Sequence, residues 1–389
     1  MIADKMKPLM ENNSAIRTMF EEGDKMRAEY GPENVYDFSL GNPNAPVPAE
    51  VKQSIIDILN EEEPTVLHGY MSNAGFEDVR ETIAQSLNRR FGTAFDHGNI
   101  LMTVGAASGL NVALKTILNP GEEVIIFAPY FLEYNWYVNN YDGKVVQAPT
   151  DQKTFYPDLE AFEKLIGDKT RVVLINTPNN PTGVIYHEET MKKMAEILEK
   201  KEKEIGHEIY LISDEPYREL VYDGNQEDFL TKYYRNTIVG YSFSKSLSLP
   251  GERIGYVAVN PKCKDAKLIV LMCGQISRFT GHNCPPSMIQ LGVAEVIDKT
   301  ADLSIYEKNK NILYKELTNM GYECVEPGGT FYMFPKTPIA DANAFCRMTA
   351  SKLDLILVPG DSFMCPGHMR LAYCTTMEMV ERALPLFEK

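Results

Sequence analysis

The chain has 389 residues, which is enough for two or three domains and a large hydrophobic core. Its composition, 44% hydrophobic and 24% charged, is ordinary for a soluble globular protein. The formal net charge of -15 argues against nucleic acid or an anionic membrane surface as a binding partner.

The N-terminal part is predicted to contain one helix followed by a turn-rich segment. The pattern over Ser14–Tyr30 predicts a helix after a short arm. Gly41–Pro48 contains three prolines and two asparagines, so we expect a stiff, turn-rich crossing into the next helix.

Short apolar runs alternate with helical patterns between about residues 100 and 260. The predicted strands are Ile100–Val104, Glu123–Ala128, Arg171–Asn176, Ile209–Asp214, Thr237–Tyr241 and Ile254–Val259. The predicted helices include Ala107–Leu118 and Glu188–Glu204. This alternation is typical of an α/β fold with a mainly parallel, doubly wound sheet covered by helices.

The C-terminal part has a different pattern. A long helical pattern begins at about Pro285. It is followed by three predicted strands, Tyr322–Val325, Thr330–Phe334 and His368–Tyr373, with a further helix between them. Together the two ends predict a smaller α+β domain. We expect a large domain over residues 46–285 and a small domain formed by residues 1–45 and 286–389.

Cysteine and histidine spacing gives no sign of disulfides or a metal site. The seven cysteines are odd in number and never spaced as C-x-x-C, and the six histidines include no H-E-x-x-H motif. The first residues contain no apolar signal-peptide region, and no apolar stretch approaches the length of a membrane span. We therefore expect a cytoplasmic protein with free thiols, no metal and no membrane association.

Lys245 lies where a predicted apolar strand ends and a hydroxyl-rich loop begins. The loop places Ser242, Ser244 and Ser246 close to the amine, and Arg253 follows eight residues on. An amine can condense with a carbonyl group, while hydroxyls and a guanidinium can bind a phosphate. The pattern favours a phosphorylated carbonyl compound as ligand; the alternative is an ordinary solvated lysine.

Two further segments carry polar groups at the ends of predicted strands. Asp214 ends an apolar strand, where a carboxylate is costly to bury unless it contacts a cation; the alternative role is a helix N-cap. Gly105, Ala106 and Ala107 begin a helix directly after a strand, and helix N-termini bind phosphate through free N–H groups.

These segments together resemble the fold-type I pyridoxal-phosphate enzymes, in particular the class I/II aminotransferases. The matching motifs cover nearly the whole chain in the family's order: Gly41-Asn-Pro43, Tyr70, Gly105-Ala-Ala107, Pro129-Tyr-Phe131, Asn180-Pro-Thr-Gly183, Asp214 with Tyr217, Ser242-Phe-Ser-Lys245, Arg253 and Arg370. The resemblance implies a large domain with a mainly parallel seven-stranded sheet, a smaller α+β domain built from both termini, a homodimer with shared active sites, and pyridoxal 5'-phosphate as cofactor.

The resemblance also implies roles around the cofactor ring. Lys245 resembles the residue that holds the cofactor as an imine and later moves a proton, and Asp214 the residue that pairs with the pyridine nitrogen. Asn180 and Tyr217 resemble the pair that hydrogen-bonds the phenolic oxygen. Phe131 matches the aromatic residue that stacks on the ring, often tryptophan in the family.

The phosphate is assigned by resemblance to a second set of residues. These combine a helix N-terminus with hydroxyls and a guanidinium: Gly105, Ala106, Ala107, Ser242, Ser244 and Arg253. Tyr70 resembles the residue that contacts the phosphate in the neighbouring subunit; the alternative is a half-buried surface tyrosine.

Substrate binding is assigned in the same way. Arg370 resembles the arginine that binds the α-carboxylate, with Asn180 and Gly41 beside it. Arg278 and Asn283 have the spacing of the aspartate branch, in which the arginine crosses the dimer interface to the distal carboxylate. Ala107 stands where another aspartate subgroup has lysine, and Arg17 is a further candidate. The alternatives for Arg278 are an interface ion pair or a surface charge.

The resemblance predicts an aminotransferase that moves the amino group of aspartate or glutamate to a 2-oxo acid such as 2-oxoglutarate. Two alternatives keep the same cofactor: a C–S β-lyase, and an aminotransferase for aromatic or neutral amino acids. A cofactor-responsive regulator would need a helix-turn-helix module, and the family's motifs already begin at Gly41.

Overall fold

The computed structural model describes residue 2, residues 15–226 and residues 228–388. Its main sheet has seven strands in the order β2-β8-β7-β6-β5-β3-β4. The strands are β2 (Ile100–Thr103), β3 (Glu123–Phe127), β4 (Lys144–Ala148), β5 (Thr170–Asn176), β6 (Tyr210–Asp214), β7 (Thr237–Ser242) and β8 (Gly255–Val259). All of its pairings are parallel except the two that β8 makes with β2 and β7. The seven-stranded, mainly parallel sheet is confirmed.

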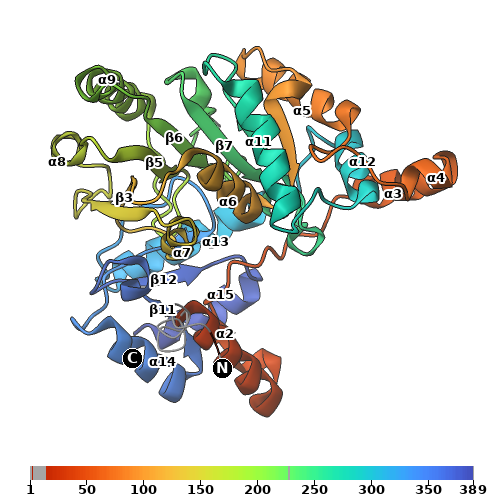
Figure 1. The fold of residues 1–389 in the computed structure, drawn as a ribbon. Coiled ribbons are helices and arrows are strands. Elements are labelled where there is room, and N and C mark those ends of the chain that lie inside the picture. The colour runs from red at the N-terminus through yellow and green to blue at the C-terminus, as the bar shows by residue number, and fades with distance from the viewer. Residues whose placement is uncertain (1, 3–14, 227, 389) are drawn as a thin grey trace.

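Helices cover both faces of this sheet (Figure 1). One face packs against α6 (Ala106–Ile117), α7 (Glu133–Asn139) and α11 (Ala266–Phe279). The other face packs partly against α8 (Leu159–Leu165) and α9 (Glu188–Ile205), and partly against α5 (Glu77–Phe91), α3 (Ala49–Glu61) and α12 (Ser287–Glu295). Successive side chains of a strand point to opposite faces, so Val172 and Leu174 of β5 join one core while Val173 and Ile175 join the other.

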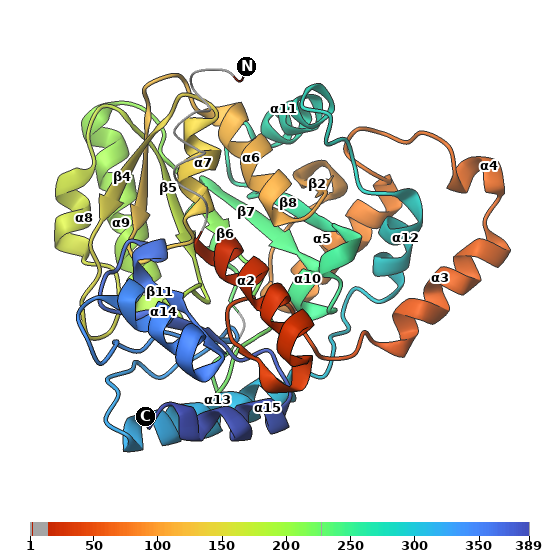
Figure 2. The ribbon, with the colours of Figure 1, turned by 90° about the horizontal axis from the view of Figure 1, so that it is seen from below.

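A second unit combines the two ends of the chain. Its helices are α2 (Ala15–Tyr30), α13 (Ser304–Asn319), α14 (Ala342–Leu353) and α15 (Met377–Ala383). Its three-stranded antiparallel sheet has the order β11-β12-β9, with β11 (Val358–Pro359), β12 (Met369–Ala372) and β9 (Tyr332–Met333). The N-terminal β1 (Tyr36–Asp37) pairs with β10 (Leu355–Ile356), and α2 contacts β11. Figure 2 shows α2 beside the C-terminal helices.

Most predicted elements are confirmed within one or two residues at each end, two predictions differ, and one strand of the main sheet was not predicted. Strand β4 was missed because it is an edge strand with an exposed or half-buried pattern rather than an apolar run. The helical pattern after Pro285 forms two helices, α12 and α13, and not one. The predicted strand Tyr322–Val325 is wrong, because the segment joins no ladder: the Tyr322 N–H donates back to the Leu317 carbonyl of α13 at 3.0 Å.

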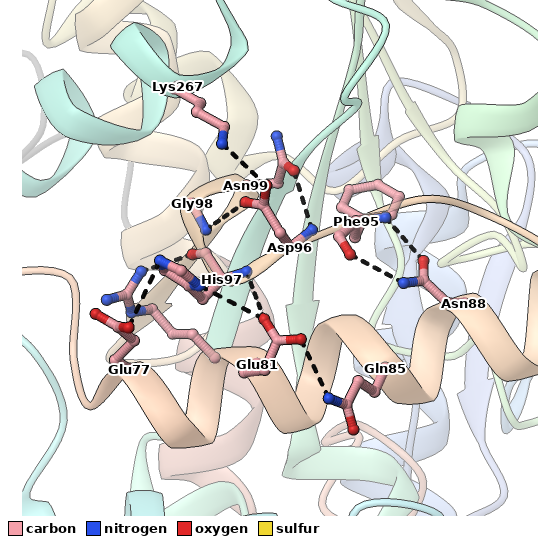
Figure 3. Close-up of polar contacts among 11 residues, drawn as sticks. Glu77, Glu81, Gln85, Asn88, Phe95, Asp96, His97, Gly98, Asn99 and Lys267 are labelled. Atoms are coloured by element: carbon pink, nitrogen blue, oxygen red, sulfur yellow. Dashed lines mark hydrogen bonds and ion pairs between the residues drawn. The ribbon is translucent and has the colours of Figure 1, made fainter.

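Polar contacts fix the loop that leads into β2 (Figure 3). The amide of Asn88, on α5, donates to the Phe95 carbonyl at 2.9 Å and accepts from the Phe95 N–H at 2.8 Å. Glu81 of the same helix accepts from the His97 N–H at 3.0 Å, and Lys267 of α11 pairs with Asp96 at 2.9 Å. These contacts hold the start of β2, the strand that leads to the N-terminus of α6.

Candidate active site

A cavity of about 280 Å³ lies where the parallel strands end, next to the second unit of the chain. Ligands of open α/β sheets bind outside the carboxyl ends of the strands. The cavity is lined by most residues that the sequence nominated: Gly41, Ala106, Ala107, Phe131, Asn180, Asp214, Tyr217, Ser242, Ser244, Lys245, Arg253 and Arg370. The fold therefore gathers motifs that are more than 300 residues apart in the sequence into one site.

Lys245 lies in α10 (Phe243–Ser246), the short helix that directly follows β7. Its Nζ donates to the Gly41 carbonyl at 2.7 Å and lies 5.3 Å from the centre of the Phe331 ring. Burial lowers the pKa of Lys245 to about 8, and the positive charges of Arg370 and Arg253 add to this lowering. A substantial fraction of the free amine is thus present near neutral pH, as a nucleophile or general base requires.

Asp214 ends β6 and is buried, with 7% of its surface exposed. One carboxylate oxygen, Oδ2, accepts a hydrogen bond from the Tyr134 hydroxyl at 2.6 Å. The other, Oδ1, has no hydrogen-bond partner among the described residues. Burial raises the pKa of this carboxyl to about 7. A cation next to Oδ1 would satisfy the oxygen and lower that pKa, so Asp214 fits a protonated ring nitrogen.

The N-terminus of α6 and the loop after β7 form an anion-binding end of the cavity. The Ser242 and Ser244 hydroxyls are 2.7 Å apart, and Arg253 lines the same cavity. Gly105, the N-cap of α6, has φ 82°, and a Cβ at this position would lie 2.6 Å from Nη2 of Arg253. Only glycine therefore allows the guanidinium to lie so close to the helix N-terminus, where free N–H groups and the helix dipole favour a phosphate.

Arg370, on β12, forms the opposite end of the cavity and is 2% exposed. Its Nη1 donates to Oδ1 of Asn180 at 3.0 Å and its Nη2 to the Ser39 carbonyl at 2.5 Å. Nε is buried and has no partner within the described part of the chain. This planar cation with an unused donor suits a carboxylate.

Aromatic side chains complete the cavity between these ends. Phe131 packs edge-on against Tyr134, with ring centres 5.6 Å apart. The Tyr217 hydroxyl donates to the Tyr332 hydroxyl at 3.1 Å. Phe131, Asp214 and Tyr217 line the same cavity, so an aromatic ring, a buried carboxylate and a phenolic hydroxyl are available to the expected pyridine cofactor.

Three predicted residues have a different placement. Tyr70, in the loop after α4 (Pro64–Leu67), is a fully exposed surface residue of the single chain, more exposed than the half-buried tyrosine of the alternative interpretation. Arg278, in the last turn of α11, is also exposed and lies outside the cavity lining. Arg17 belongs to α2, but its side chain is outside the described part of the structure.

The sequence analysis missed four polar residues of the cavity: Tyr134, Tyr137, Asn176 and Tyr332. Asn176 ends β5 as Asp214 ends β6, and its amide donates to the Asp214 carbonyl at 2.8 Å. A polar residue at the end of an apolar strand was therefore a usable signal. Tyr134 follows Phe131 at helical spacing, whereas no local pattern identifies Tyr332.

Comparisons with known proteins agree with this geometry. Residues 33–385 match the family described as aminotransferase class I and II. The aspartate aminotransferase of Thermotoga maritima is 31% identical over 363 residues, covering 92% of this chain and 91% of that protein. Aromatic-amino-acid aminotransferase 2 of Thermococcus litoralis is 29% identical over 398 residues, covering 98% and 96%. The crystal structure of an amino transferase from Eubacterium rectale has a TM-score of 0.95 at 44% identity, covering 100% of this chain and 97% of that one.

Because the family match spans most of the chain and the Thermotoga maritima relative covers nearly all of it, the motifs at the strand ends have a common origin with those of known enzymes. The chain belongs to the class I and II aminotransferases, as a fold-type I, pyridoxal-phosphate-dependent enzyme that resembles the aspartate aminotransferase branch.

Proposed function

We propose that this aminotransferase takes the amino group of an acidic L-amino acid, aspartate or glutamate, and delivers it to a 2-oxo acid such as 2-oxoglutarate. The observation that carries the proposal is Arg278. This arginine is exposed and forms no ion pair with any described residue, at the end of a helix with an exposed apolar surface. It is thus available to a distal carboxylate across a subunit interface, and several relatives are named aspartate aminotransferase.

A homodimer is part of this proposal. Large apolar side chains are exposed on α11 and near α4, namely Leu268, Leu271, Met272, Phe279, Val66 and Tyr70. Large exposed apolar side chains of this kind favour a protein–protein interface. In such a dimer Tyr70 and Arg278 of one subunit would complete the active site of the other.

The domain division and the location remain proposals as well. The expected division was a large domain over residues 46–285 and a small domain over residues 1–45 and 286–389. Because α12 (Ser287–Glu295) packs on α3 and α5, we propose that the large domain extends through α12 and that the C-terminal part of the small domain begins after it. No helix in the described ranges is long and apolar enough to cross a membrane. The seven cysteines are free thiols, which supports the cytoplasm as the location.

In the proposed mechanism the chain positions the substrate and moves one proton. Pyridoxal phosphate, when bound, supplies the carbonyl carbon that takes up the amino group and a ring that withdraws electrons. Arg370 and Asn180 bind the α-carboxylate and thereby orient the substrate Cα. The Lys245 amine removes the Cα proton as general base, and Asp214 keeps a proton on the pyridine nitrogen. Ser242, Arg253 and the α6 N-terminus bind the phosphate.

Replacing Arg253 with alanine should weaken cofactor binding far more than it slows turnover at saturating cofactor, because the guanidinium acts on the phosphate. A charged hydrogen-bond partner contributes about 1.5–3 kcal/mol, so we expect roughly a 10- to 150-fold higher dissociation constant for pyridoxal phosphate. Fluorescence titration of the apoenzyme measures this constant. Lys262→Ala, at an exposed position outside the cavity, is the control; an unchanged constant in Arg253→Ala would remove Arg253 from the site.

Replacing Arg278 with alanine tests the substrate proposal. The wild-type enzyme should favour aspartate or glutamate in a half-reaction screen that follows the cofactor absorbance. For the acidic substrates, the transition-state stabilisation calculated from kcat/KM should fall by about 2–5 kcal/mol. The distal carboxylate of the bound substrate would then be buried without its guanidinium partner. Alanine and phenylalanine should be used as well as before or better, because their side chains have nothing to pair with a guanidinium.

Equal losses for acidic and neutral substrates would mean that Arg278 only supports the dimer, which sedimentation of the variant would reveal. Lys264→Ala, an exposed residue just before the same helix, is the matched control. A wild-type preference for neutral amino acids would overturn the acidic-substrate proposal and leave the aminotransferase assignment intact.

A second candidate function is an aminotransferase for aromatic or neutral amino acids. The Thermococcus litoralis relative carries an aromatic-amino-acid name. In addition, Glu133 interacts electrostatically with Arg370, and its Oε2 is buried without a hydrogen-bond partner among the described residues. A carboxylate so placed would repel an acidic substrate side chain. The same substrate screen separates the two candidates.

A further inference from the structure

Tyr332 contacts three of the proposed site residues, although neither the motifs nor the family match gives it a role. It belongs to β9 and lines the cavity with 3% of its surface exposed. Its hydroxyl is 3.1 Å from the Tyr217 hydroxyl, and its ring centre lies 4.4 Å from the Arg370 guanidinium carbon. Tyr332 thus connects the residue proposed for the phenolic oxygen of the cofactor with the residue proposed for the substrate carboxylate.

The two tyrosine hydroxyls have one proton each, which limits how they can bond. In the structure Tyr217 donates to Tyr332. If Tyr217 donates instead to the phenolic oxygen of a bound cofactor, it can keep its bond to Tyr332 only by accepting a hydrogen bond from the Tyr332 hydroxyl. Burial raises the pKa of Tyr332, so its hydroxyl stays protonated and can donate. The Tyr332 hydroxyl has no other hydrogen-bond partner in the described part of the chain.

Gly41 makes room for this hydroxyl. A Cβ on residue 41 would lie 1.8 Å from the Tyr332 oxygen, so any larger residue would displace the tyrosine. The Gly41 carbonyl also accepts from Nζ of Lys245 at 2.7 Å. The position of Tyr332 is therefore defined on one side by Gly41 and on the other by Tyr217.

We propose that Tyr332 is a positioning residue with two separable actions. Its hydroxyl donates to Tyr217 and so strengthens the bond that Tyr217 donates to the cofactor's phenolic oxygen. Its ring supports the Arg370 guanidinium by a cation–π contact. The proposal rests on the proposed roles of Tyr217 and Arg370, and the experiments below distinguish its failure from theirs.

The hydroxyl is tested by replacing Tyr332 with phenylalanine and titrating the absorbance of enzyme-bound pyridoxal phosphate with pH. A weaker bond from Tyr217 stabilises the phenolic oxyanion less, so the pKa of the bound cofactor should rise by roughly half a unit to one unit. Tyr217→Phe should raise it more, and the double variant no more than Tyr217→Phe alone, because Tyr332 acts through Tyr217.

Tyr373→Phe is the matched control: it removes another buried hydroxyl, bonded to the Thr330 carbonyl at 3.3 Å, that does not line the cavity. Its titration should equal the wild type. If the pKa of the bound cofactor shifts in Tyr217→Phe but not in Tyr332→Phe, the proposed action of the Tyr332 hydroxyl is wrong and the proposed role of Tyr217 is supported. No shift with either variant overturns both.

The ring is tested by comparing Tyr332→Phe with Tyr332→Leu in binding of two carboxylates, maleate and hydrocinnamate, to the holoenzyme. The Tyr332→Phe variant retains the ring and should bind both carboxylates with affinities within about twofold of those of the wild type. The Tyr332→Leu variant should bind both carboxylates roughly 3- to 30-fold more weakly, as expected for loss of a cation–π contact. Equal affinities in the two variants would overturn the action of the ring. If Arg370→Ala also binds both ligands normally, the role of Arg370 fails too.

Discussion

Replacing Lys245 with alanine should abolish transamination while the protein remains folded. The amine is in the proposed mechanism both the point of attachment for the cofactor and the base at the substrate Cα, and no other described lysine lines the cavity. We expect activity to fall by several orders of magnitude. Borohydride reduction followed by peptide mass spectrometry should find the cofactor on Lys245 in the wild type and nowhere in the variant.

Two controls distinguish chemistry from stability. Lys264→Ala changes an exposed lysine outside the cavity and should leave turnover and cofactor attachment unchanged. The unfolding temperature of Lys245→Ala should be no lower than that of the wild-type apoenzyme. Burial destabilises the charged form of the Lys245 amine and lowers its pKa to about 8, so removing the amine should not reduce stability. Substantial turnover in Lys245→Ala would mean that another residue carries the reaction.

The same pKa predicts how the apoenzyme captures its cofactor. Only the neutral amine attacks a carbonyl, and Lys245 is half neutral near pH 8. The capture rate for pyridoxal phosphate should therefore rise as the pH increases through about 8 and then level off. A rate that keeps rising to pH 10 would indicate an amine with its ordinary pKa.

Local rules were sufficient for six of the seven strands of the main sheet and for the polar residues that follow them, whereas the family resemblance supplied most other residues of the cavity. Strands β5, β6 and β7 are short apolar runs, and in a parallel sheet their carboxyl ends meet at one edge. Any polar residue directly after such a run is brought to that edge. The sequence alone could therefore identify Asp214 and Lys245 as candidate site residues.

The residues that were missed depend on contacts that are remote in sequence. Tyr332 is 115 positions from Tyr217, its hydrogen-bond partner, and no periodicity links the two. The predicted strand Tyr322–Val325 failed for a related reason: a strand needs a partner strand, and the local sequence cannot show that none will lie beside this segment. Arg278 shows the remaining limit, since its proposed role depends on a second subunit.

Replacing Asp214 with asparagine should leave cofactor binding nearly intact and reduce turnover by several orders of magnitude. The amide has nearly the shape of the carboxylate, but it cannot stabilise a proton on the pyridine nitrogen by its charge. Removing a buried carboxylate with one unpartnered oxygen should not destabilise the fold, so thermal unfolding of the apoenzyme should be unchanged or raised. The phosphate end, around Arg253, is untouched and should keep the affinity for pyridoxal phosphate.

Tyr134→Phe supplies the comparison that identifies the cause. This variant removes the 2.6 Å hydrogen bond to Oδ2 but leaves the carboxylate charge in place. We expect a loss of at most roughly 10- to 150-fold in kcat, because one hydrogen bond to a charged group, which contributes about 1.5–3 kcal/mol, is lost while the ion pair with the ring nitrogen remains. Single-turnover kinetics at saturating cofactor measure both variants. If Asp214→Asn loses tenfold or less, or no more than Tyr134→Phe, then Asp214 acts through its hydrogen bonds and its shape, and the proposed role of its charge at the ring nitrogen is wrong.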